Sequence, residues 1–178
     1  GDNRAVYALL EASANPEDRF VEHAILYSLM TLGKTEPVVR ALNHPVENVP
    51  RSALIVLDQL EGSPLRKNHV VPFLQSKNAA LQHTGMWVVS HHLDWSDMVV
   101  DFLESNGKRG PLTEGEKGSM TSLMITFSGD KRLQDFVSNK MRSPATSVAD
   151  KLLFLEVISR CPLEALPVEW IRLLENLL

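Results

Sequence analysis

The sequence has a single cysteine, Cys161, few aromatic residues (6%) and no long apolar run. One cysteine excludes an internal disulfide framework and any zinc or iron–sulfur site that needs several thiolates. No stretch reaches the roughly 18 apolar residues of a membrane span or has the pattern of a signal peptide, so we expect no direct membrane insertion. A net charge of −4 and a pI near 5.9 lack the basic excess of a nucleic-acid binder, so nucleic acid is not an expected partner.

The composition is that of a folded chain. Of the 178 residues, 44% are apolar and 22% are charged, and a chain of this size buries roughly two thirds of its unfolded surface. The sequence opens without an initiator Met and closes on an amphipathic stretch, 168–178, with no cap signal after it. We therefore interpret residues 1–178 as one domain that is a piece of a longer, multidomain protein.

Five apolar stretches with helical periodicity share a layout, at 24–33, 53–62, 85–94, 120–129 and 152–161. Their starts lie 29, 32, 35 and 32 residues apart, and three of them end on Gly, the usual residue of a left-handed helix C-cap. Shorter amphipathic stretches lie between them, at 36–42, 65–74, 95–103 and 131–141. Two helices per repeat of this length indicate an α-solenoid.

Local signals agree with an all-α chain. Asn15 and Ser63 each precede a proline. This order predicts that Asn15 and Ser63 are N-caps and that the proline after each lies in the first turn of a helix. Thr113 and Glu116 have the spacing of a capping box. The longest irregular segment, 104–115, is predicted to be an exposed loop between helices. No stretch alternates apolar and polar residues for long enough to predict a sheet.

Residues 44–60 resemble a HEAT repeat. In that family an HP-type turn, here His44-Pro45, leads into a helix of the form V-R-x-A-A-x-x-A-L-x-x-L. The residues on its apolar positions here are Val49, Ala53, Val56, Leu57 and Leu60. Pro50 stands where the repeat normally carries Arg, which weakens any charge ladder between repeats. The other repeats match more loosely, and together the resemblance covers nearly the whole chain. It implies a right-handed, armadillo-like α-α superhelix of about five helix pairs plus a terminal helix.

Residues 20–24, 53–60 and 92–95 are also similar to the HEAT segment of large exported bacterial proteins, found in planctomycetes and their relatives. In those proteins the segment joins a sugar-dehydrogenase-like β-propeller to a C-terminal c-type cytochrome domain. The haem motif C-x-x-C-H is absent from this sequence. The resemblance implies a connector without a cofactor of its own, with haem in a flanking domain and a periplasmic or otherwise exported location. The residues themselves leave a cytoplasmic location open.

These features predict a non-catalytic scaffold, because no catalytic motif such as H-E-x-x-H or G-x-S-x-G occurs. Stacked repeats offer an extended curved surface, and polar positions on the long helices are where a protein partner or a flanking domain of the same chain would bind. Helix spacing nominates five such residues: Glu22, Arg51, Gln59, Gln82 and Ser119. Exposed end repeats also predict weak self-association.

Two alternatives stay open. One is a HEAT-like enzyme of the repair-glycosylase or chromophore-lyase type. The other is a metal- or haem-contacting subunit that uses the region from His83 to Asp97. Against the latter, His91 and His92 point roughly 100° apart on a helix, so both can hardly join His83.

The three tryptophans have separate predictions. Trp87 lies mid-helix among apolar residues and is predicted to be core. Trp95 and Trp170 stand near helix starts. We expect them to pack between neighbouring helices. The alternative is that they are exposed and anchor a protein partner.

Overall fold

The computed structural model describes residues 3–106 and 113–176, and within these ranges every regular element is a helix. The prediction of an all-α chain is therefore confirmed for the described residues. Contacts divide the chain into two compact units, residues 1–88 and 89–178. Each unit is described by itself, and the prediction of a single domain over 1–178 stays a prediction.

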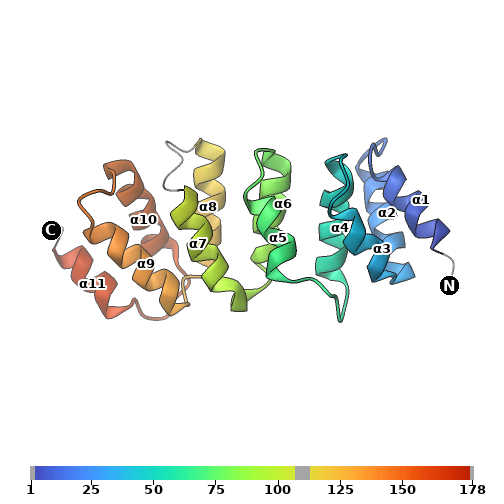
Figure 1. Ribbon diagram of the computed structural model, residues 1–178. Coiled ribbons are helices and arrows are strands. Elements are labelled where there is room, and N and C mark those ends of the chain that lie inside the picture. Colours follow the sequence, from blue (N-terminus) through green and yellow to red (C-terminus); the bar gives the residue numbers. More distant parts are fainter. Residues whose placement is uncertain (1–2, 107–112, 177–178) are drawn as a thin grey trace. The chain divides into compact units, whose positions relative to one another are not determined.

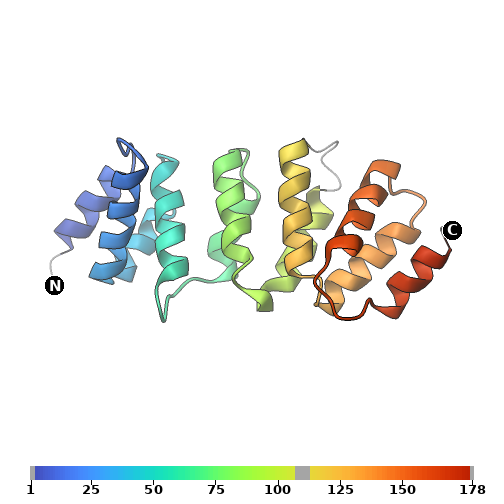
Figure 2. The same cartoon turned by 180° about the vertical axis from the view of Figure 1, so that it is seen from behind.

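The first unit contains six helices, α1 (Arg4–Ala12), α2 (Arg19–Leu32), α3 (Thr35–Ala41), α4 (Asn48–Gln59), α5 (Lys67–Leu74) and α6 (Ala79–Val89). Figure 1 shows α1, α3 and α5 on the near side of this unit, and Figure 2 shows α2, α4 and α6 on the opposite side. The helices of this unit thus form two layers. The layer of α2, α4 and α6 holds most of the apolar stretches 24–33 and 53–62, but only the first half of 85–94, because α6 ends at Val89.

The core of the first unit is built around α4. Val49, Ala53, Val56 and Leu57 of this helix are fully or almost fully buried and pack with apolar residues of α1, α2 and α3. Pro50, the departure from the HEAT pattern, is buried in the first turn of α4. A proline is tolerated there because the first amide groups of a helix have no intrahelical acceptor.

The second unit contains the short 3₁₀ helix η1 (Leu93–Trp95) and the helices α7 (Ser96–Asn106), α8 (Glu114–Thr126), α9 (Lys131–Arg142), α10 (Val148–Arg160) and α11 (Val168–Glu175). Helix α9 packs against α7, α10 and α11, and α8 packs against α10. Trp95 and Trp170 are both buried. Trp170 is fully enclosed, and its Nε1 donates a hydrogen bond to the carbonyl oxygen of Gln134 on α9, at 3.2 Å. Trp170 therefore joins α11 to α9, as predicted, and the burial of Trp95 contradicts the alternative of an exposed anchor at that position.

Helix starts follow the sequence in part. The Thr113–Glu116 capping box is present at α8. The starts predicted at Asn15 and Ser63 are wrong, because α2 begins at Arg19 and α5 at Lys67. At α2 the Asp18 carboxylate accepts hydrogen bonds from the amides of Phe20 and Val21. One carboxylate that satisfies two amide groups fixes the start of α2 at this point, and Pro16 lies in the loop before the helix.

Helix ends differ among the three predicted glycine caps. Gly33 ends α2 in the left-handed conformation, with φ of 61°. Gly62 also has a positive φ, of 66°, but it lies two residues beyond Leu60, the C-cap of α4. Gly129 does not adopt a positive φ, since α8 ends at Thr126 with Phe127 as its C-cap. The predicted loop at 104–115 is shorter at both ends, because α7 continues to Asn106 and α8 begins at Glu114. The rest of it, 107–112, lies outside the described residues.

Candidate functional site

A groove on the first unit lies over α4, between α2 and α6, and has a volume of about 280 Å³. We call it the α4 groove. All three helices lie on the side of the unit that faces the viewer in Figure 2. Its lining residues are Glu22, His23 and Leu26 of α2, Arg51 and Ile55 of α4, and His83, Thr84 and Trp87 of α6.

Helical periodicity explains why these residues meet. Each helix contributes residues one turn apart, such as Arg51 and Ile55 on α4, and residues at i and i+4 lie on the same face of a helix. The opposite side of α4, with Ala53 and Val56, is buried in the core. The same spacing that builds the core therefore directs Arg51 and Ile55 outward, where both are half-buried.

The central polar contact of the α4 groove joins two of the predicted partner-binding residues. Arg51 donates from Nη1 to Oε1 of Glu22, which connects α4 to α2. The two side chains are only 31% and 19% exposed. Water and salt screen such a partly buried pair less than they screen a surface pair. The pair places a neutral, directional polar group in the groove beside the apolar Leu26 and Ile55.

Trp87 lines the α4 groove and is 39% exposed, so the prediction that it belongs to the core is wrong. Its neighbours Met86 and Val88 are buried. Successive residues of a helix point roughly 100° apart, so burial of these neighbours leaves Trp87 on another face. Because α6 is apolar on several sides, the sequence does not mark which of these residues faces solvent.

The structure places the other three nominated residues outside the α4 groove. Gln59 is exposed at the end of α4, and its Nε2 donates to Oδ2 of Asp58 at 2.7 Å. Ser119 is half-buried on α8, in the second unit. Gln82 is only 9% exposed, and its Nε2 donates to the carbonyl oxygen of Leu74 at 3.0 Å. Gln82 therefore packs α6 against α5 and presents little surface to a partner.

The histidine region has no metal-binding geometry in the described structure. His83 lines the α4 groove, whereas the His92 ring stacks on Trp95 with centroids 3.9 Å apart. Within residues 3–106 and 113–176, no three His, Cys, Asp or Glu side chains gather closely enough to hold a metal ion. The alternative of a metal site between His83 and Asp97 thus gains no support.

Comparison of the chain with protein-family models, with curated proteins and with solved structures finds no match. Among the helices of the described residues, none is both long and apolar enough to cross a membrane.

Proposed function

We propose that this chain is a HEAT-type repeat module that binds a protein partner, or another part of its own polypeptide, through the α4 groove. The observation that carries the proposal is the meeting of the Glu22–Arg51 pair and the half-exposed Trp87 in one groove. Two of the five residues nominated for partner binding thus lie beside an aromatic side chain that the sequence did not nominate.

The chemistry of the α4 groove suits a protein segment. Trp and Arg dominate the energetically important positions of protein interfaces, where they lie in partly desolvated pockets. Leu26 and Ile55 supply apolar surface around them. Arg51 is already held by Glu22, so less side-chain freedom is lost when a partner binds.

The proposal also includes the arrangement of the helices as a solenoid. Its support is the two-layer alternation of helices within the first unit, together with the resemblance of residues 44–60 to a HEAT repeat. We extend it to a right-handed superhelix of about five helix pairs plus α11, with no catalytic role. In the parent protein the module would connect a dehydrogenase-like propeller to a cytochrome domain of an exported redox enzyme.

Photo-crosslinking tests the binding surface. A photoreactive amino acid replaces Trp87 in the full-length protein, expressed in its source cells, and a matched control replaces Tyr7, an exposed aromatic residue on α1 that does not line the groove. We expect position 87 to crosslink to one specific partner segment and position 7 to give none. Arg51→Glu should abolish that crosslink, whereas Arg40→Glu on α3 should not. Equal crosslinking at both positions would contradict the proposal.

The mass and haem content of the native protein test the connector role. A native mass far above 19.9 kDa together with covalent haem would support it. A mass near that value without haem would contradict the connector role while leaving the groove proposal intact.

A further inference from the structure

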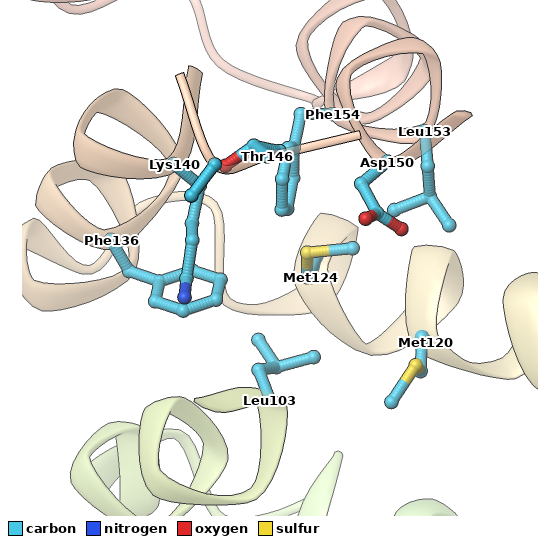
Figure 3. A pocket seen from close by; sticks show the side chains of 10 residues that line it. Leu103, Met120, Met124, Phe136, Lys140, Thr146, Asp150, Leu153 and Phe154 are labelled. Carbon is cyan, nitrogen blue, oxygen red and sulfur yellow. The ribbon is translucent and has the colours of Figure 1, made fainter. Parts of the chain in front are cut away.

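A second cavity lies wholly within the second unit and has a volume of about 120 Å³. Figure 3 shows its lining side chains, which come from α7, α8, α9, α10 and the segment before α10. We call it the Met124 pocket, because Met124 lies in the middle of this view. The large apolar side chains that line it are those of Leu103, Met120, Met124, Phe136, Leu153 and Phe154.

The walls of the Met124 pocket suit a small apolar group. Phe136 and Phe154 meet edge to face with ring centroids 6.0 Å apart, and methionine side chains adapt to the shape of what they contact. An apolar cavity of about 150 Å³ holds a benzene molecule, so 120 Å³ corresponds to an apolar group of about four to six heavy atoms. Displacing water from apolar walls favours such a group.

Two charged side chains also line the pocket, and they are not equivalent. The Lys140 ammonium lies 5.4 Å from the centroid of the Phe136 ring, and among the described residues no carboxylate is paired with it. The Asp150 carboxylate instead accepts a hydrogen bond from the Ser147 hydroxyl at 2.7 Å, in the first turn of α10. Figure 3 shows Lys140 and Asp150 on opposite sides of Met124. A carboxylate beside Lys140 would therefore lie on the Phe136 side of Met124, and Asp150 is on the other side of it in this view.

We propose that the Met124 pocket binds an apolar chain or ring of about four to six heavy atoms that ends in a carboxylate, with that carboxylate paired with Lys140. The apolar part would contact Met120, Met124 and Phe154. A free short-chain organic acid and an apolar residue at the C-terminus of a peptide share this chemistry. The site lies in the other unit from the α4 groove, so it does not rest on the proposed function.

The test is a titration of the purified protein with 4-methylpentanoate, followed by the NMR signals of the Met120 and Met124 methyl groups. We expect saturable shifts with the acid and about tenfold weaker binding of 4-methylpentanamide, which has the same shape without the charge. The dipeptide acetyl-Gly-Leu distinguishes the two sources. Tighter binding than the free acid assigns a peptide C-terminus, and weaker binding assigns a small organic acid.

Matched lysine variants locate the carboxylate. Lys140→Met should weaken binding of the acid about tenfold, and Lys140→Arg should largely retain it. Lys131→Met is the control, because Lys131 lies exposed on the same helix and pairs with Asp135 at 2.7 Å. Circular dichroism verifies that each variant is folded. The proposal is overturned if the Met signals do not shift, if the amide binds as well as the acid, or if Lys131→Met weakens binding as much as Lys140→Met.

Discussion

Gly85 on α6 lies so close to Phe73 on α5 that a β-carbon added to the glycine would be 2.9 Å from the β-carbon of Phe73. The same added atom would be 3.2 Å from the backbone nitrogen of Leu74. One turn away from Gly85, Gln82 donates to the Leu74 carbonyl oxygen. Helices α5 and α6 are thus joined by a close backbone approach and a hydrogen bond between a side chain and the backbone.

Gly85→Ala should destabilise the protein. The new methyl group forces α5 and α6 apart, at a cost of about 1–3 kcal/mol in the free energy of unfolding measured with urea. Gly118→Ala on α8 is the matched control, since nothing lies within 4 Å of the added carbon there. That change should stabilise the protein by about 0.5–1 kcal/mol, because alanine is the better helix residue. Equal changes in the free energy of unfolding for Gly85→Ala and Gly118→Ala would show that α5 and α6 have room for the added methyl group.

Gln82→Leu should destabilise the protein without affecting binding at the α4 groove. It leaves the buried Leu74 carbonyl oxygen without its donor, which costs about 1–3 kcal/mol in the free energy of unfolding. Gln59→Ala, at an exposed position, should change that free energy by less than about 0.5 kcal/mol. Loss of the crosslink at position 87 in a folded Gln82→Leu variant would instead show that Gln82 takes part in binding the partner.

A double-mutant cycle on Glu22 and Arg51 should give a measurable coupling energy. Because the pair is partly buried, we expect about 1 kcal/mol from urea unfolding of Glu22→Ala, Arg51→Ala and the double variant. The matched cycle uses Glu36 and Arg40, an i,i+4 pair with side chains 71% and 69% exposed. It should give no more than about 0.5 kcal/mol, and added salt should reduce it further. Coupling energies of the same size in both cycles would show that partial burial does not strengthen the Glu22–Arg51 pair.

Substitution of Trp170 should lower the free energy of unfolding more than substitution of Trp87. Trp170→Phe removes the hydrogen bond to Gln134 and costs about 1 kcal/mol, while Trp170→Ala also leaves a cavity and costs about 3–5 kcal/mol. Trp87→Ala should cost less than Trp170→Ala, because Trp87 is partly exposed. Thermal or urea unfolding of the three variants measures this order, and the reverse order would contradict it.

Helical periodicity predicted where the helices lie better than where they start. Helices α2, α4, α6, α8 and α10 all begin four to six residues before the apolar stretches that revealed them. In α8, residues 114–119 have no large apolar side chain, so its hydrophobic periodicity begins late. In α2, Phe20 and Val21 precede the apolar stretch but are exposed, so they do not extend its buried face. Local chemistry did fix the start of α8, where Thr113 and Glu116 form the predicted capping box. The short helix α1 had no predicted counterpart.

The candidate site was predictable only in its separate parts. Glu22 and Arg51 were nominated by helix spacing, but their pairing joins positions 29 residues apart and depends on how α2 packs on α4. For Gln82 and Trp87, the polarity of the side chain predicted the wrong degree of burial. The polar Gln82 is buried because it finds a carbonyl acceptor on α5, and the apolar Trp87 is exposed because α6 has more apolar residues than its buried faces can hold.

The division of the chain at residue 88 has a consequence for cooperativity. Each unit has buried apolar residues of its own, so each can melt as a separate cooperative block. Substitutions at Gly85, Gln82, Glu22 and Arg51 would then shift one transition, and those at Gly118 and Trp170 would shift the other. A single shared transition for all of them would mean that the two units unfold as one cooperative block, so that a partner bound to the first unit also stabilises the second.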